Sequence, residues 1–261
     1  MEKEIIAEKN IRKFKINKFI DQEDFIITES HLTLFINGYQ FLTLMVLKEN
    51  LENLITGFLA AEGIIKTQKD LLKIEFKYNK TVAVIEINGE FSAEDYKKRT
   101  LTSGCGAAST FINLEDCAAA KIINSKMKIE AEKLCSLMVE LQQNSSYFQK
   151  TGGTHTAALA EKERIIYQCE DIGRHNALDK IIGRAINGNL ILEDKIVLSS
   201  GRISSEMIVK TLKQGIPFLV SRSAPTTAAV KIAGDREMTL VGFCRGKRFN
   251  IYSGEERIKL E

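Results

Sequence analysis

One cysteine stands alone between two glycines, in the segment TSGCG at residues 102–106. Glycine on both sides removes the side chains that would shield the sulfur, and it lets neighbouring backbone N–H groups turn toward a thiolate or an anion. A thiol that only packs in a core needs none of this. We therefore expect Cys105 to be a reachable nucleophile.

Two segments supply histidines. In TGGTHTAA, residues 151–158, two glycines and Thr154 precede a predicted helix, so free backbone N–H groups and His155 would face one anion-binding space. The alternative is a glycine turn with a surface or capping histidine. In EDIGRHNALDK, residues 170–180, a strand leads into a helix with His175 in its first turn, where the helix dipole favours a neutral ring.

The same run places Arg174 where it is suited to bind phosphate and Asp171 where it could orient a histidine. The alternative is a capped and solvated helix start. Nearby N–H dipoles together with His155, His175 or Arg174 are expected to lower the pKa of Cys105, because a free thiol is mostly protonated at neutral pH.

Two further segments, SSGR at 199–202 and SRSAPTT at 221–227, share one design: a strand end, hydroxyl residues with an arginine, then a helix. Arg202 and Arg222 would each help to form a cradle for phosphate or a pterin, although helix capping explains the hydroxyls equally well. The segment after the last long strand is a candidate for binding a pyrophosphate and stacking a planar base, and a solvated basic hairpin is its alternative. Its residues are Phe243, Cys244, Arg245, Gly246, Lys247 and Arg248.

Apolar periodicity predicts the elements that position these residues. The first third is expected to form a hairpin of strands 31–36 and 39–44 around Asn37-Gly38, a helix at 51–61, and strands at 71–77 and 81–88. A helix follows at 127–143. Alternation then predicts strands at 164–168, 195–199, 217–221 and 238–243, with helices at 173–187, 203–214 and 225–233.

The predicted fold is therefore α/β, with a mixed layered sheet and a smaller β-rich N-terminal part. We expect a β-rich region with one helix at 1–95, a connector loop with Cys105 at 96–126, and an α/β domain at 127–261. The polar segments follow strand ends, which is where α/β sheets place their ligands.

Composition excludes several classes of protein. A net charge of +3 is too small to indicate general nucleic-acid binding, and no apolar stretch approaches the roughly 20 residues of a membrane span or forms a signal peptide. We expect a cytoplasmic protein. The five cysteines form no C-x-x-C pair, so reduced thiols are expected, with Cys135 and Cys169 buried. No zinc-protease or zinc-deaminase motif occurs, and no metal is predicted.

Taken together and in this order, the segments TSGCG, TGGTHTAAL, EDIGRHNALDK, SGRISSEM, SRSAPTTAAV and LVGFCRGKR resemble the formate dehydrogenase accessory sulfurtransferase family, FdhD. The resemblance covers roughly residues 50–252. It implies a cytoplasmic protein that accepts sulfur as a persulfide from a cysteine desulfurase. The sulfur then passes to the molybdenum bis(molybdopterin guanine dinucleotide) cofactor, the bound substrate, before that cofactor enters apo formate dehydrogenase.

The resemblance also assigns roles within this sequence. Cys105 matches the persulfide-carrying cysteine, and residues 243–248 match the stretch assigned to cofactor binding. The family's larger domain is similar to the cytidine-deaminase-like α/β fold without zinc, and a homodimer is expected by analogy. Many members carry a second cysteine three positions after the first, where this chain has Ala108, so Cys105 would act without a resolving thiol. The alternatives are a chaperone that binds the cofactor without sulfur transfer, and a Cys-His hydrolase.

Overall fold

The computed structural model describes residues 5–92 and 120–260. Cys105, Ala108 and most of the predicted connector at 96–126 lie outside the described residues.

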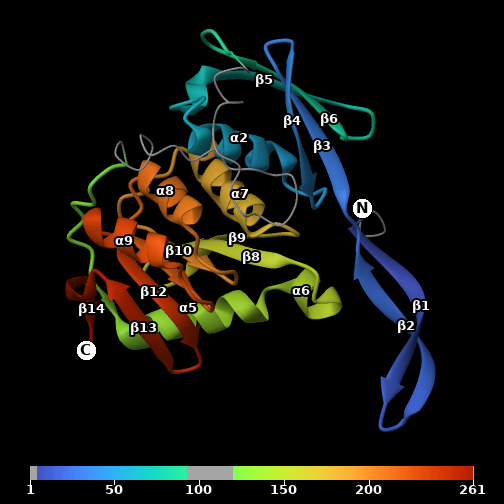
Figure 1. Ribbon diagram of the computed structural model, residues 1–261. Coiled ribbons are helices and arrows are strands. Elements are labelled where there is room, and N and C mark those ends of the chain that lie inside the picture. The colour runs from blue at the N-terminus through green and yellow to red at the C-terminus, as the bar shows by residue number, and fades with distance from the viewer. Residues whose placement is uncertain (1–4, 93–119, 261) are drawn as a thin grey trace.

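A six-stranded mixed sheet forms the centre of the larger part (Figure 1). Its order is β13-β12-β11-β10-β8-β9, with β10, β11 and β12 parallel and β8 and β13 antiparallel to their neighbours. The strands are β8 (His155–Ala160), β9 (Ile165–Asp171), β10 (Ile196–Ser199), β11 (Phe218–Ser221), β12 (Thr239–Arg245) and β13 (Arg248–Ser253). The ends of β9, β10, β11 and β12 and the starts of β8 and β13 consequently lie at one edge of the sheet.

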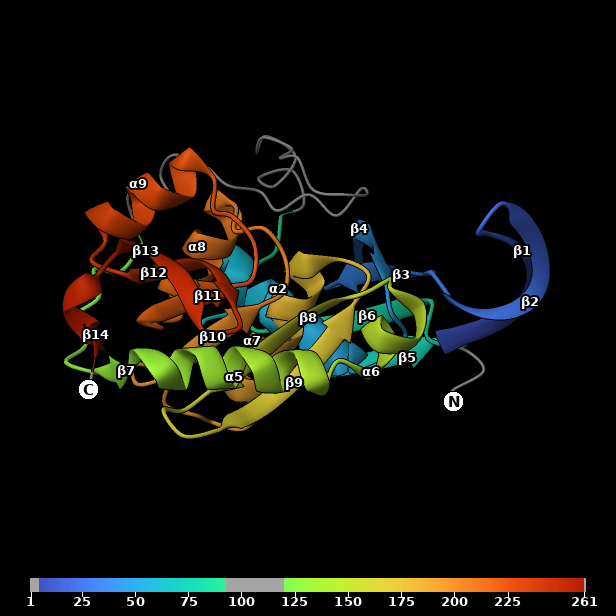
Figure 2. The same ribbon diagram turned by 90° about the horizontal axis from the view of Figure 1, so that it is seen from below.

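Helices cover both faces of this sheet (Figure 2). On one face lie α7 (Arg174–Asn187), α8 (Ser205–Lys213) and α9 (Thr227–Asp235), and on the other lies α5 (Ala131–Gln143). The strands are apolar on both faces, because alternate residues of one strand enter the two cores: Val197 packs with α7 and α8, while Leu198 packs with α5. The helices and strands predicted for this part are confirmed within a few residues at their ends.

The N-terminal part is a four-stranded sheet of order β4-β3-β6-β5 with one helix, α2 (Leu51–Glu62), between this sheet and α7. The strands are β3 (Ser30–Ile36), β4 (Tyr39–Val46), β5 (Leu71–Lys77) and β6 (Val82–Ile87). Asn37 and Gly38 have φ angles of 47° and 86°, as the two-residue hairpin turn requires, so the predicted hairpin is confirmed.

Two glycines bring the two parts together. A Cβ atom on Gly57 of α2 would overlap the carbonyl oxygen of Asp179 in α7, and one on Gly183 of α7 would overlap the carbonyl oxygen of Asn53. The helices therefore cross with their backbones in contact, and the N-terminal sheet is held firmly against the larger part.

A hairpin that the sequence did not predict projects from the body of the molecule. It consists of β1 (Ile6–Lys15) and β2 (Lys18–Ile27), which pair over their whole length (Figure 1). Its residues alternate charges with isolated apolar side chains and supply no buried face, which is the signal that strand prediction needs. A short helix, α6 (Ser146–Thr151), and a two-stranded parallel pair of β7 (Ile129–Glu130) with β14 (Ile258–Lys259) complete the larger part.

The cytidine-deaminase-like likeness and the three domain boundaries stay predictions. Over residues 5–92 and 120–260, none of the helices has the length and apolar character that a membrane crossing needs.

Candidate functional site

The polar segments singled out in the sequence do meet at one edge of the six-stranded sheet. His155 starts β8, Arg174 starts the helix after β9, and Arg222 follows β11. A cavity of about 440 Å³ opens at this edge, between the sheet, the end of α5 and α6. It is lined by Leu141, Gln142, Ser145, Phe148, Gln149, Gly152, Gly153, Thr154, His155, Thr156, Ile172, Ser200 and Arg222.

The segment around His155 does not precede a helix, so that prediction is wrong. Gly152, with a φ of 67°, ends α6, and the chain then enters β8 as a strand. Pairing with β9 and β10 on its two sides overrides the local helix signal. Thr154 caps no helix, since its hydroxyl donates to Glu170 Oε2 at 2.7 Å. The same carboxylate accepts from the backbone N–H groups of Tyr147 and Phe148, so it fixes this wall of the cavity.

Gly201 allows the side chains of Arg174 and His155 to lie side by side. A Cβ atom there would come within 3.0 Å of Cβ of Arg174 and 3.2 Å of Nδ1 of His155. Any other residue would require Arg174 or His155 to shift by a few tenths of an ångström. The Ser200 hydroxyl lies 3.5 Å from the same His155 nitrogen and accepts a hydrogen bond from the Thr156 N–H at 2.9 Å.

The arginines at this edge differ in exposure. Arg174 is only 9% exposed, Arg222 is half-buried and Arg202 is exposed. The Nε atoms of Arg174 and Arg222 are buried and find no hydrogen-bond partner among the described residues. A buried guanidinium N–H without a partner is costly, so both groups are suited to an anion that completes their hydrogen bonding.

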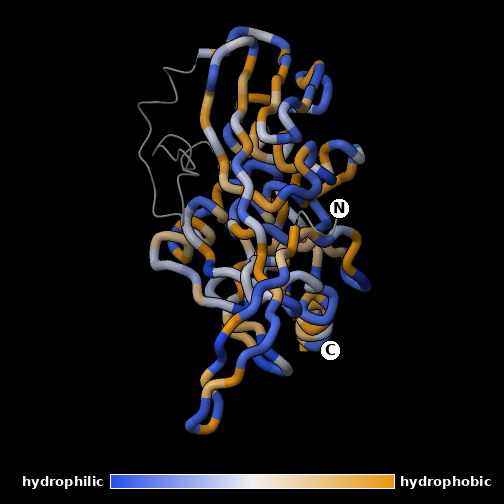
Figure 3. The backbone as a smooth tube through the Cα atoms, turned by 90° about the vertical axis from the view of Figure 1, so that its right-hand side faces the viewer, coloured by the Kyte–Doolittle hydropathy of each residue, from blue (hydrophilic) through white to orange (hydrophobic). Residues whose placement is uncertain are grey.

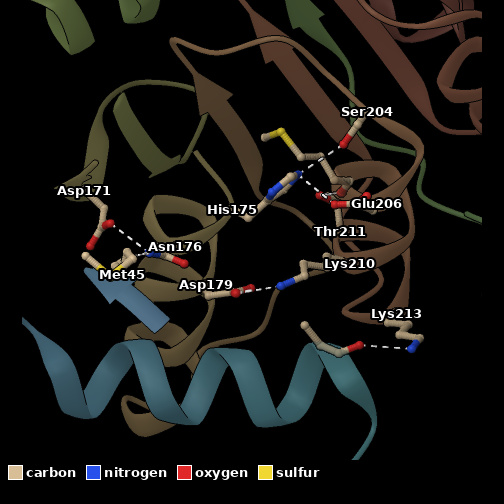
Figure 4. Close-up of polar contacts among 12 residues, drawn as sticks. Met45, Asp171, His175, Asn176, Asp179, Ser204, Glu206, Lys210, Thr211 and Lys213 are labelled. Carbon is tan, nitrogen blue, oxygen red and sulfur yellow. Dashed lines mark hydrogen bonds and ion pairs between the residues drawn. The ribbon is translucent and has the colours of Figure 1, made fainter. Parts of the chain in front are cut away.

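The two histidines occupy different environments. Burial lowers the pKa of His155, and the adjacent Arg174 lowers it further. His155 lines the cavity, whereas His175 is 7% exposed and turns into the protein. Its Nε2 lies 3.2 Å from Ser204 Oγ and 3.1 Å from Glu206 Oε2 (Figure 4).

Burial, with Lys210 and Arg174, lowers the pKa of His175 to about 3, so its ring is neutral at pH 7. The predicted placement of His175 in the first turn of a helix is confirmed, since α7 begins at Arg174.

Asp171 contacts Lys180, Leu47 and Asn176, and not a histidine as predicted. Its Oδ2 forms an ion pair with Lys180 Nζ at 2.7 Å and accepts the Leu47 N–H, and its Oδ1 accepts from Asn176 at 2.9 Å. Asn176 also donates to the Met45 carbonyl (Figure 4). Asp171 therefore holds the end of β4 against the start of α7.

The segment predicted to bind a pyrophosphate forms the turn between β12 and β13. Arg245 Nε donates to the Arg222 carbonyl at 2.9 Å, which joins this turn to the end of β11. Phe243 is partly exposed, with a φ of 52° in a bulge of β12. Cys244 is fully buried beneath α5, and burial raises its pKa to about 12, so this side chain packs in the core away from solvent.

The remaining residues of that turn, Gly246, Lys247 and Arg248, are exposed. Gly246 and Lys247 line a second cavity, beside α5, which is separate from the one containing His155. The structure therefore brings Arg174, Arg222 and His155 together, and it links the β12–β13 turn to them through Arg245. The binding roles of these residues stay predictions.

Sequence reasoning missed Glu170 and the α6 wall of the cavity. Glu170 stands in a run of polar residues, and nothing in its type or spacing distinguishes an exposed carboxylate from one that is buried by a distant helix. Cys135 and Cys169 are buried as predicted, and burial raises the pKa of both thiols, that of Cys169 to about 11.

The comparisons with known proteins agree on one family. Residues 27–259 match the model of the FdhD/NarQ family. A sulfur carrier protein FdhD from Listeria innocua is 40% identical over 259 residues, which cover 98% of this chain and 99% of that protein. A sulfur carrier protein FdhD from Bacillus subtilis is 36% identical over 263 residues, which cover 99% of this chain and all of that protein.

A solved structure shares the fold. The crystal structure described as that of a formate dehydrogenase accessory protein from Desulfotalea psychrophila superposes with a TM-score of 0.81 at 22% identity. The superposition covers 98% of this chain and the whole of the other.

Proposed function

Because this chain belongs to the FdhD/NarQ family, we propose that it is a sulfur carrier that supports the maturation of formate dehydrogenase. Its sequence is similar to sulfur carrier proteins along nearly its whole length, so the proposal rests on all the described elements rather than on one motif.

The finer proposal concerns Cys105, which lies outside the described residues. Its thiolate attacks the terminal sulfur of a persulfide on a cysteine desulfurase. One S–S bond forms and another breaks, the desulfurase thiolate leaves, and Cys105 becomes a persulfide without a net change in electrons. Delivery of that sulfur to molybdenum as sulfide takes two electrons, supplied by the reduced metal or an external thiol.

The observation that supports a phosphate-bearing substrate is the pair of buried arginine Nε atoms at the carboxyl edge of the sheet. Molybdenum bis(molybdopterin guanine dinucleotide) carries two pyrophosphates, and guanidinium groups bind such anions through paired N–H donors. In a site of low polarity these contacts are stronger than in water. Arg174 and Arg222 would bind phosphate oxygens, and neutral His155 would accept or donate one hydrogen bond beside them.

Sulfur loading tests the proposal. The protein is incubated with cysteine and a cysteine desulfurase, and intact mass followed by peptide mapping locates any added sulfur. We expect one added sulfur atom on Cys105, lost in Cys105→Ser and retained in Cys117→Ser. An unmodified Cys105, or formate dehydrogenase maturation that survives Cys105→Ser, would instead favour a cofactor-binding chaperone. A covalent acyl adduct on Cys105 would favour a hydrolase.

Guanosine diphosphate tests the nucleotide end of the substrate. We expect its affinity to fall when Arg245, Lys247 and Arg248 are replaced together, and to weaken with salt because the contacts are ionic. An unchanged binding isotherm would remove the β12–β13 turn from the site.

A further inference from the structure

Two cysteines meet beneath α5, on the face of the six-stranded sheet opposite α7. Cys135 lies on the apolar side of α5 and Cys244 lies on β12, and both belong to one buried cluster. Figure 3 looks along α5, just above the label of the C-terminus, and shows apolar and polar residues on the same helix. The Cys244 thiol lies 4.0 Å from the carbonyl oxygen of Leu134, the neighbour of Cys135, and it is hydrogen-bonded to the Cys135 thiol. The two thiols are therefore neighbours in space although they are far apart in the chain.

A groove gives one of these two thiols access to solvent. This groove is the second cavity, about 480 Å³ in volume, between α5 and the β12–β13 turn. Cys135 lines it beside Val139 and Phe249 and is 8% exposed, whereas Cys244 is fully buried. A small molecule in the groove therefore meets Cys135 first.

Cys169 provides a contrast within the same chain. It is buried like the other two, but it packs in the core cluster on the opposite face of the sheet from Cys135 and Cys244. The described lining of either cavity does not include it. Burial of a thiol in this protein thus does not by itself bring it to a second thiol and an opening.

The two neighbouring thiols differ in how readily they ionise. Burial raises the pKa of both, that of Cys244 to about 12, but the hydrogen bond from Cys244 acts to lower the pKa of Cys135. Cys135 is therefore the thiol that becomes a thiolate, while Cys244 keeps its proton.

We propose that Cys135 and Cys244 are a redox-active pair, which a small hydroperoxide entering through the groove converts into a disulfide. The Cys135 thiolate attacks one peroxide oxygen, the O–O bond breaks, and the leaving oxygen takes up the proton that Cys135 gave up. With hydrogen peroxide this step yields a sulfenic acid and water, and the sulfur is oxidised by two electrons. The Cys244 thiol then attacks that sulfur, the S–O bond breaks, and the hydroxyl leaves with the Cys244 proton as a second water.

The disulfide joins α5 to β12 across the core. It closes a loop of roughly 100 residues, and a cross-link of this span removes conformational freedom from the unfolded chain. Because α5 also supplies Leu141 and Gln142 to the first cavity, the same bond fixes one wall of the candidate site. Oxidation therefore locks the helix in place.

Mass analysis of the oxidised full chain tests the pair. Cys105→Ser with Cys117→Ser is the background, so that the thiols counted are Cys135, Cys169 and Cys244. The protein is treated with hydrogen peroxide, then with catalase, and is alkylated in denaturant. We expect the loss of two hydrogens, one alkylated thiol, and a peptide pair that joins Cys135 to Cys244. Cys169→Ala is the matched control and should form this disulfide at the same rate. Three alkylated thiols, or a disulfide that contains Cys169, would overturn the proposal.

Further variants test the order of the steps and the route of the oxidant. Cys244→Ala should leave a sulfenic acid on Cys135 that dimedone captures, whereas Cys135→Ala should leave Cys244 unmodified. Val139→Trp, which fills the groove, should slow the disulfide about threefold or more, because oxidation follows exposure. Ile191→Trp, at a 71% exposed position outside the groove, should not slow it. Dimedone on Cys244 instead of Cys135, or an unchanged rate in Val139→Trp, would show that the oxidant does not enter here.

Thermal unfolding tests the lock. The oxidised background protein should unfold at a midpoint higher by roughly 5 °C or more than the reduced protein, and dithiothreitol should reverse the rise. Cys135→Ala should show no rise after the same treatment. A midpoint that stays the same or falls, in protein whose disulfide the mass analysis has located, would show that the bond does not lock α5. Cooperative unfolding of each reduced variant checks that it is folded.

Discussion

Two regions of this protein bury cations, and they do so in opposite ways. Around α7, Lys180 is paired with Asp171 of β9 at 2.7 Å, and Asp179 is paired with Lys210 of α8 at 2.6 Å. All four side chains are almost fully buried. At the carboxyl edge of the six-stranded sheet, Arg174 is also buried, yet its Nε has no partner among the described residues. A buried cation that the fold pairs holds the structure together, whereas one that the fold leaves unpaired is available to a ligand.

The largest effect is expected where a buried lysine has a carboxylate partner. Asp171→Ala should lower the free energy of unfolding by about 3–5 kcal/mol, because it strands a buried Lys180 ammonium and frees the N–H of Leu47. Chemical denaturation measures the loss. The control is Glu75→Ala, which breaks the exposed pairs with Lys73 and Lys77 and should leave the free energy of unfolding nearly unchanged. Equal losses in the two variants would show that the buried pair stabilises the fold no more than an exposed one.

The next effect is a dependence of stability on pH. His175 has a folded-state pKa of about 3, below its ordinary value of 6.5, so the unfolded chain binds the proton more readily between these values. The contribution of the neutral ring is therefore complete above pH 6.5 and is lost as pH falls, by up to about 1.4 kcal/mol for each pH unit.

Denaturation curves from pH 8 to pH 4 measure this contribution. His175→Gln should be less stable than the wild type at neutral pH, and the difference should shrink toward acid. His31→Gln, at an exposed position, should follow the wild-type curve. A constant gap between wild type and His175→Gln would show that the ring does not resist protonation.

The smallest effect on stability is expected at the edge of the sheet. Arg174→Gln with Arg222→Gln should change the free energy of unfolding by less than about 1 kcal/mol, because neither Nε loses a described partner. Affinity for guanosine diphosphate should fall roughly tenfold or more, as loss of a hydrogen bond to a charged group does.

Arg164→Gln, just before β9 and so at the opposite edge of the sheet, is the matched control and should leave binding unchanged. If the double variant loses as much stability as Asp171→Ala, these arginines stabilise the fold in the way that Lys180 and Lys210 do. Unchanged nucleotide binding would place the anion elsewhere.

Sequence reasoning succeeded where a signal was local. The Asn37-Gly38 hairpin, the periodic helix α5 and the alternation of strands with helices after residue 164 all follow from neighbouring residues. It failed where distant contacts decide the outcome. TGGTHTAA enters a strand because β9 and β10 pair with it, and Asp171 binds Lys180 instead of a histidine. The β1–β2 hairpin was missed for a different reason, because it has no buried face to mark it as strand.

The residue types alone determined that arginines, histidines and hydroxyls follow successive strands, and parallel strands end at one edge of a sheet. Tertiary structure alone decided which cations meet a carboxylate. Lys180 and Arg174 lie six positions apart on the same helix, and neither spacing nor composition separates them. The difference arises because the end of β9 carries Asp171 to Lys180, while Gly201 leaves Arg174 beside His155 at the edge of the sheet.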